Sequence, residues 1–462
     1  MALLTVPFLS PSPALSFSAS GFSSPYSHPF PGILLFTSKR IRRPIAKNNV
    51  APIMASADAA QSDRPTKLVT FLGKGGSGKT TSAIFAAQHY AMEGLNTCLV
   101  IHSQDPTADF LLNCKIGTSP TKCNNHLSAV KLETTKMLIE PLRRIKEADD
   151  RLQLTQGALE VVVAEELGVL PGMDSIFSVL ALGRLLGFLR NDSQQNSQQE
   201  KFDIIVLDGM SSEEIVRMIG ATSKSRLYLK YLRRLAEKTD MGRLAGPSLL
   251  RLLDEAMGFS NPGAILNGSS QIWDQLEQIL ERGSSFFNAL QSFACYLVVD
   301  SNRHLSLASA LRYWGCAIQA GAQVSGALTF GTQNTKIELA DVAKNFSPLP
   351  FACMPHLSLS SYPDWNGVLM DAQSQDARRI LRLTGHDSSI SPPVNFNPSN
   401  KSITLLMPGF DKSEIKLYQF RGGSELLVEA GDQRRIIHLP SQIRGKVGGA
   451  KFIDRSLVIT MR

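Results

Sequence analysis

Long apolar runs are absent from this chain, and so are closely paired cysteines. No stretch of the 462 residues reaches the roughly 18 uncharged apolar positions of a membrane-spanning helix, so we expect no integral membrane span. The six cysteines contain no C-x-x-C pair, and the nearest two are Cys114 and Cys123. This spacing predicts neither a zinc clamp nor a disulfide framework. Free thiols in a reducing compartment are the expectation.

Acidic residues are missing from the first 57 positions. Residues 1–57 hold no Asp or Glu, are rich in Ser and Pro, and carry five of the net +8 charges, on Lys39, Arg40, Arg42, Arg43 and Lys47. These features predict an organelle transit peptide, disordered and later removed, and they favour the chloroplast stroma because no Arg-rich amphipathic helix is evident. A basic tail that stays attached is the alternative. The remaining charge is nearly balanced, so it does not indicate a nucleic-acid partner.

One glycine-rich stretch carries the clearest chemical signal. It fits G-x-x-x-x-G-K-[ST] and consists of Gly73, Lys74, Gly75, Gly76, Ser77, Gly78, Lys79 and Thr80. A short apolar run at 67–72 predicts the strand that must precede such a loop, and 80–92 has helical spacing. Loop N–H groups and the helix N-terminus would then cradle a phosphate chain. We expect Lys79 to reach the β- and γ-phosphates and the Thr80 hydroxyl to hold Mg²⁺, with Thr81 completing an ATP site.

Two aspartates follow other predicted strands. Residues 95–102 predict a strand that delivers Asp105 to the carboxyl edge of the sheet, where ligands bind in open α/β folds. An Asp at that edge can orient the attacking water, and a simple helix N-cap is the alternative. The apolar run 201–209 ends in Asp208, which can hold Mg²⁺ through a water molecule.

The second lysine of the loop, Lys74, points to a family. The pattern K-G-G-x-G-K-T resembles the deviant Walker A loop of the Min/Par partition ATPases, the nitrogenase iron protein, the arsenite-pump ATPase and the tail-anchored-protein targeting ATPases. The resemblance implies a homodimer in which Lys74 acts catalytically on the partner's nucleotide, and a solvated loop charge is the alternative. The segment Asp105-Pro106-Thr107 looks like the first switch of the arsenite-pump and targeting ATPases, whose catalytic aspartate Asp105 matches.

Later motifs depart from that family. Its second switch is matched at Asp208 and Arg217, but Glu213 and Glu214 stand where Gly and His are expected. Phe330 occupies the position of an Asn that reads adenine. Nucleotide binding is expected to survive these changes, while the coupling of hydrolysis to closure and the base selectivity stay open.

Helical periodicity dominates two segments, about 127–190 and 226–290. Leu154 to Leu189 is strongly apolar, and Pro171 to Asp174 looks like the Pro-Gly-Ile-Asp-Glu element of the targeting ATPases. In that family these helices build a groove for a client transmembrane helix. A helix that is apolar on most faces is either buried core or an open groove, and both interpretations stay open here.

The C-terminal part changes class. Residues 371–398 predict a linker, and 399–462 show short alternating runs separated by Gly- and Pro-containing turns. This predicts a small β-sandwich, and its segments 406–417 and 427–440 resemble the α-crystallin domain of small heat-shock proteins. A sheet edge of this domain could bind a partner by strand addition, or the domain could brace the rest of the chain.

These patterns together predict an α/β P-loop NTPase at 66–370, with a mostly parallel sheet and a helical apolar subdomain, followed by a small all-β sandwich. The resemblance implies an ATP-hydrolysing homodimeric targeting factor or chaperone. Closure with ATP and Mg²⁺ would control binding of a hydrophobic, tail-anchor-like segment, and a membrane receptor would be a further partner. The alternatives are a nucleotide-binding scaffold with weak turnover, an arsenite- or anion-transport ATPase subunit, which would need clustered thiols, and a partitioning or cofactor-assembly ATPase.

Overall fold

The computed structural model describes residues 65–153, 178–179, 181–183, 185–186, 201–257, 269–331, 336–357, 361–382 and 392–462. The predicted transit peptide at 1–57 lies outside the described residues. So does the Pro171 to Asp174 element, together with most of the apolar stretch Leu154 to Leu189.

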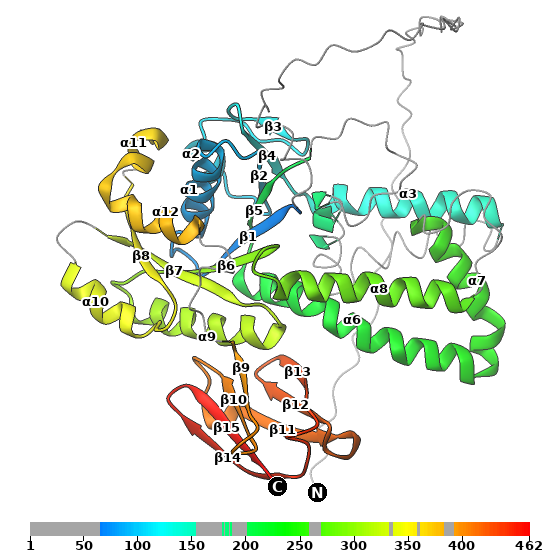
Figure 1. The fold of residues 1–462 in the computed structure, drawn as a ribbon. Coiled ribbons are helices and arrows are strands. Elements are labelled where there is room, and N and C mark those ends of the chain that lie inside the picture. The colour runs from blue at the N-terminus through cyan, green and yellow to red at the C-terminus, as the bar shows by residue number, and fades with distance from the viewer. Residues whose placement is uncertain are drawn as a thin grey trace, which may run out of the picture. The chain divides into compact units, whose positions relative to one another are not determined.

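An eight-stranded sheet forms the centre of the first part of the chain (Figure 1), in the order β3-β4-β2-β5-β1-β6-β7-β8. Neighbouring strands run parallel except for β3 and β4. The strands are apolar along most of their length, as burial on both faces of a parallel sheet requires. They are β1 (Lys67–Leu72), β2 (Thr97–Ile101), β3 (Thr121–Lys122), β4 (Leu127–Lys131), β5 (Ile204–Asp208), β6 (Phe293–Val299), β7 (Val324–Gly331) and β8 (Phe351–Pro355).

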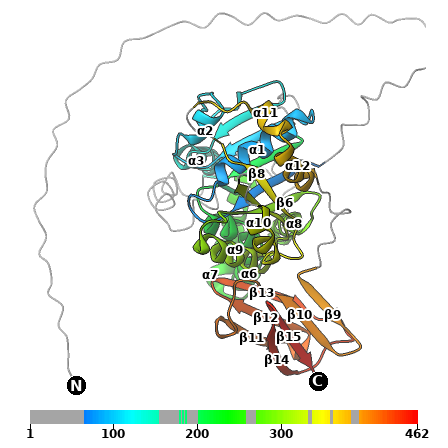
Figure 2. The same cartoon turned by 90° about the vertical axis from the view of Figure 1, so that its left-hand side faces the viewer.

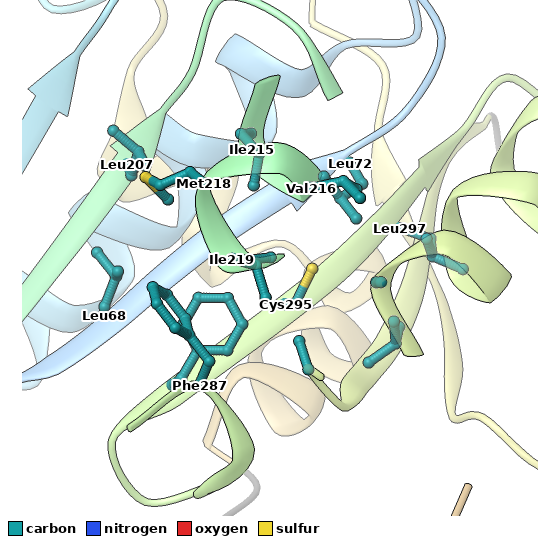
Figure 3. Close-up of a cluster of buried hydrophobic side chains, with 14 of the residues drawn as sticks. Leu68, Leu72, Leu207, Ile215, Val216, Met218, Ile219, Phe287, Cys295 and Leu297 are labelled. Carbon is teal, nitrogen blue, oxygen red and sulfur yellow. The ribbon is translucent and has the colours of Figure 1, made fainter. Parts of the chain in front are cut away.

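Helices cover both faces of this sheet (Figure 2). One face carries α1 (Lys79–Met92), α2 (Thr107–Leu111), α11 (Trp365–Met370) and α12 (Gln375–Arg382). The other carries α9 (His304–Ala320), the first turns of α6 (Ser212–Lys238) and the last turn of α8 (Ser269–Asn288). Figure 3 shows Ile215, Val216 and Ile219 of α6 packed over apolar side chains of the central strands.

A helical subdomain extends from the sheet. It contains the remainder of α6 and α8 together with α3 (Thr134–Leu152) and α7 (Asp240–Met257) (Figure 1). Ala148 of α3 and Leu252 of α7 form a small buried cluster of their own. The helix α10 (Lys336–Lys344) follows β7.

The C-terminal residues form two antiparallel sheets around one buried apolar cluster. One sheet has the order β14-β15-β10-β9 and the other β11-β12-β13. We call residues 392–462 the β-domain. Its strands are β9 (Val394–Asn397), β10 (Ser402–Leu406), β11 (Ile415–Phe420), β12 (Glu425–Ala430), β13 (Gln433–His438), β14 (Val447–Ile453) and β15 (Ser456–Met461).

The predicted fold class is confirmed, while two segment assignments are wrong. Leu127–Lys131, placed at the start of a helical segment, is the strand β4 beside β2. The predicted linker 371–398 contains α12 and β9. Its polar composition concealed a short amphipathic helix, because only Ala377, Ile380 and Leu381 of α12 are buried and they share one face.

Candidate functional site

Two glycines of the loop between β1 and α1 are required by its geometry. A Cβ on Gly73 would lie 2.4 Å from the Val298 carbonyl oxygen of β6, so the loop can leave the sheet here only without a side chain. Gly78 adopts a left-handed conformation with φ 93° directly before α1, which glycine accommodates at little cost. A loop of this shape directly before a helix can aim its N–H groups and the helix N-terminus at one point, as a phosphate site requires.

Lys79 and Asp208 lie at this point together with Thr80. The Lys79 ammonium donates to the Gly73 carbonyl oxygen over 3.2 Å. Burial lowers the pKa of Lys79, although the charges of Asp208 and Glu213 oppose the effect. Burial also raises the pKa of Asp208 to about 6, opposed by a hydrogen bond from Thr80.

The oxygen atoms at this point fit Mg²⁺. Asp208 is only 4% exposed, and its Oδ2 atom has no hydrogen-bond partner among the described residues. A buried carboxylate oxygen without a donor is suited to a cation or to a water bound to one. Thr80 supplies a hydroxyl oxygen beside it. The two residues predicted to hold Mg²⁺, Thr80 and Asp208, therefore lie side by side, and their side chains offer the oxygen ligands that Mg²⁺ prefers.

Asp105 follows β2 at the same edge of the sheet. Its Oδ1 atom accepts hydrogen bonds from the Thr107 backbone N–H over 2.8 Å and from the Thr107 hydroxyl over 2.5 Å. These bonds lower the pKa of Asp105, which therefore stays ionised at neutral pH. Its charge also reaches Asp208 and contributes to the raised pKa there. These bonds form a local turn before α2, whose N-cap position is held by Pro106 and not by Asp105. The role of Asp105 in orienting water stays a prediction.

Ser212 is a site residue that the sequence interpretation missed. Its hydroxyl accepts from the Gly73 N–H over 2.9 Å and donates to the Gly73 carbonyl over 2.8 Å, tying the second switch to the phosphate loop. The preceding Ser211 caps α6 by accepting from the Glu214 N–H. The S-x-x-E pattern of Ser211 to Glu214 is a helix-start signal that could have located the beginning of α6, although not the bonds between Ser212 and Gly73.

Phe330 packs against the loop, and Lys74 is one of its residues. A Cβ on Gly78 would lie 2.4 Å from the Phe330 ring, so the aromatic ring packs directly on the loop. Phe330 offers no polar atom to a base, and the open question of base selectivity persists. Lys74 lies partly exposed on the loop, where a second molecule can reach it, and its action in trans stays a prediction.

A strand, a phosphate-binding loop, a helix and two aspartates at one sheet edge define an ATP-hydrolysing P-loop NTPase. Residues 66–306, more than half of the chain, match the family described as Anion-transporting ATPase, and the chain belongs to this family. Residues 398–461 match the HSP20-like domain found in ArsA, in agreement with the predicted α-crystallin-like domain.

The chain is also similar in sequence to several known proteins. A putative arsenical pump-driving ATPase of Chlorobaculum tepidum is 24% identical over 410 residues, covering 85% of this chain and 95% of the relative. An uncharacterised protein of Streptomyces coelicolor is 25% identical over 419 residues, covering 85% and 96%. The ATPase GET3 of Komagataella phaffii is 24% identical over 233 residues, covering 49% of this chain and 62% of the relative.

The described residues contain neither a membrane-spanning helix nor a cluster of metal ligands. None of the helices there combines the length and hydrophobicity that crossing a bilayer requires. Within the same residues, no group of three or more His, Cys, Asp or Glu side chains is arranged to hold a metal ion. The Mg²⁺ interpretation therefore rests on Thr80, Asp208 and the phosphates of a bound nucleotide.

Proposed function

We propose that this ATPase is a homodimeric targeting factor or chaperone of the chloroplast stroma. ATP with Mg²⁺ closes two copies of the chain, and this closure controls the binding of a hydrophobic, tail-anchor-like segment of a client protein. The observation that carries the proposal is an exposed apolar surface on the helix that begins at the phosphate site.

That surface spans α6 and α7, and we call it the α6–α7 apolar face. On α6 its residues recur at positions i, i+3, i+4 and i+7, the spacing of one helical face. Its members are between 55% and 85% exposed, which is unusual for so many large apolar side chains on two helices in contact. They are Tyr228, Tyr231, Leu232 and Leu235 of α6 and Met241, Leu244 and Leu249 of α7.

Charge pairing indicates what kind of partner fits. Two basic side chains of α6 near the apolar face are engaged by acids of α8: Arg226 lies 3.4 Å from Glu281, and Arg233 lies 2.7 Å from Asp274. They are thus already compensated and have little to offer an acidic ligand. An apolar helix laid along the face would find matching spacing of side chains.

The same helix links this face to the phosphate site. α6 begins at Ser212, bonded to Gly73, and its first turns are buried against the central strands (Figure 3). Its 27 residues make a rod about 40 Å long. A displacement of the second switch on nucleotide binding would therefore be transmitted to the apolar face.

Exposed side chains support closure against a second copy. Met210 of the second switch and Leu305 of α9 are both exposed large hydrophobic residues, and both follow strands that end at the sheet edge carrying the phosphate loop. A partner copy on this edge would cover them. The same contact would bring Lys74 of each copy toward the partner's nucleotide.

The test uses the full chain carrying Asp105→Asn to stall hydrolysis. We expect it to capture a labelled peptide of about 20 apolar residues with ATP and Mg²⁺ and to release it without nucleotide. The double variant Leu232→Ser/Leu235→Ser should lose capture, whereas Ile453→Ser, at a β-domain position with similar exposure (52%), should keep it. The proposal would be overturned if peptide capture did not depend on nucleotide, or if the double variant still captured the peptide.

A metalloid-driven ATPase is the second candidate, favoured by one contact. The Cys123 thiol lies beside that of Cys114. Burial is the main reason that the pKa of Cys123 is raised to about 12, and the neighbouring Cys114 thiol is the second. Soft thiol ligands suit trivalent arsenic, although a protonated Cys123 weakens such a site. Arsenite-stimulated turnover that Cys114→Ser abolishes and Cys353→Ser retains would establish this function. Turnover indifferent to arsenite would eliminate it.

A further inference from the structure

The β-domain and the second switch meet on neighbouring residues of α9. Arg312 forms an ion pair with Glu414 of the β-domain. The next residue, Tyr313, donates its hydroxyl hydrogen to the Glu213 carboxylate of the second switch. Burial, together with this carboxylate, raises the pKa of Tyr313, which keeps the hydroxyl protonated as a donor.

The β-domain is docked on α9 by close backbone contacts. A Cβ on Gly315 would lie 2.2 Å from the Pro408 carbonyl oxygen, and one on Gly409 would lie 2.4 Å from the Arg312 nitrogen. Arg435 of β13 donates to the Ile318 carbonyl oxygen of α9 over 3.0 Å. Backbones this close leave no room for side chains between them, so the contact is a specific packed interface.

The partner of Arg312 is itself fixed in place. Glu414 closes a capping box in which its second carboxylate oxygen accepts from the Asp411 N–H over 2.9 Å. The Arg312 guanidinium also lies 4.4 Å from the centre of the Phe410 ring. The ion pair with Glu414 and the contact with Phe410 therefore both hold Arg312, the residue of α9 next to Tyr313.

Glu213 brings a negative charge to the phosphate site. Its charge acts on Lys79, the residue expected at the β- and γ-phosphates, so an unrestrained Glu213 carboxylate would repel a bound triphosphate. The ATPases that this chain resembles have a glycine at this position, and a glycine needs no such restraint because it carries no charge.

We propose that Tyr313 is a positioning residue for ATP turnover. It holds the Glu213 carboxylate against α9, and the docked β-domain holds α9 so that this contact persists. This role of Tyr313 in nucleotide turnover does not depend on what the α6–α7 apolar face binds.

The first test is Tyr313→Phe in the full chain. We expect the KM for ATP to rise about threefold or more, with a smaller change in kcat and an unchanged melting temperature. In a Glu213→Gln background the charge is gone, so adding Tyr313→Phe should leave KM unchanged. Tyr418→Phe, a half-exposed tyrosine of the β-domain, is the matched control. The proposal fails if Tyr313→Phe leaves KM unaltered, or raises it equally without the Glu213 charge.

The second test loosens the docking. Gly315→Ala forces α9 and the Pro408 segment apart, whereas Gly449→Ala meets nothing within 4 Å and serves as its control. Glu414→Gln removes the ion pair without adding bulk and keeps the test decisive if Gly315→Ala does not fold. Hydrogen exchange in β10 to β13 reports the loosening. A KM that rises with the exchange supports the coupling, and a KM that stays constant while exchange increases overturns it.

Discussion

Asp208 carries a charge that its surroundings disfavour. Its folded-state pKa of about 6 lies above the usual 3.8 because the carboxyl is buried, so the folded chain holds this proton more tightly than the unfolded chain does. The stability that results is fully present below pH 3.8 and is lost as the pH rises through about 6. The difference amounts to at most about 3 kcal/mol. A bound Mg²⁺ would compensate this cost, which is how a binding site trades stability for function.

Asp208→Asn should therefore stabilise the nucleotide-free protein. We expect its melting temperature to exceed that of the unaltered chain at pH 8, with the difference shrinking toward pH 4, because protonated Asp208 is uncharged like the Asn that replaces it. Stabilisation of the chain by MgATP should disappear in the variant. Melting curves over pH, with and without MgATP, check both. An equal shift at every pH would contradict the assigned pKa.

His89 of α1 is a second residue whose burial is costly. Both ring nitrogens are buried without hydrogen-bond partners among the described residues, and burial lowers the pKa of His89 to about 4. Because this lies below the usual 6.5, stability is lost as the pH falls from 6.5 toward 4.

We expect His89→Leu to raise the free energy of unfolding by roughly 1 kcal/mol at pH 8, since the unpaired polar atoms are removed. The gain should be larger at pH 5, where folding the unaltered chain also requires loss of a proton. Thermal denaturation at the two pH values measures this. A gain that is greater at pH 8 would show that His89 has an unseen partner.

At the scale of elements, α12 shows how a misread segment becomes part of the core. The Tyr90 hydroxyl of α1 donates to the Leu381 carbonyl oxygen over 3.0 Å, and the Tyr296 hydroxyl of β6 donates to the Ile380 carbonyl oxygen over 3.3 Å. Both bonds are buried. The last turn of α12 is therefore tied to the sheet and its covering helix.

Tyr90→Phe should destabilise this connection. The Leu381 carbonyl would lose its donor in a buried place, which costs about 1–3 kcal/mol. We expect a lower melting temperature and faster hydrogen exchange in α12, with no change in the KM for ATP. Normal exchange in α12 would show that Tyr296 alone is sufficient to hold it.

Local sequence signals predicted the elements around the site well. The run 67–72, the loop and the helix after it were confirmed because strand, turn and helix signals coincide there. The tie between Ser212 and Gly73 joins residues 139 positions apart, and the bonds between α9 and the β-domain join residues 102 and 117 positions apart. No local pattern encodes such contacts, since they arise only when the sheet order brings the segments together.

At the scale of the whole molecule, the role of Lys74 decides whether one chain can work alone. Each copy would contribute Lys79 to its own nucleotide and Lys74 to its partner's, so the two residues of one site would come from different chains. Asp105 and Asp208 lie at the edge where the partner would close, and the exposed Met210 and Leu305 would be covered there.

Mixing two inactive variants tests this arrangement. Lys74→Ala and Lys79→Ala homodimers should each lack turnover, because every site misses one lysine. In a mixed dimer, the site of the Lys74→Ala copy keeps its own Lys79 and receives Lys74 from the Lys79→Ala copy, so it is complete. Random exchange makes half of the dimers mixed, each with one complete site, and we expect about a quarter of the normal ATPase rate. A mixture as inactive as its components would mean that Lys74 acts within its own chain, and the dimer would then be unnecessary for the chemistry.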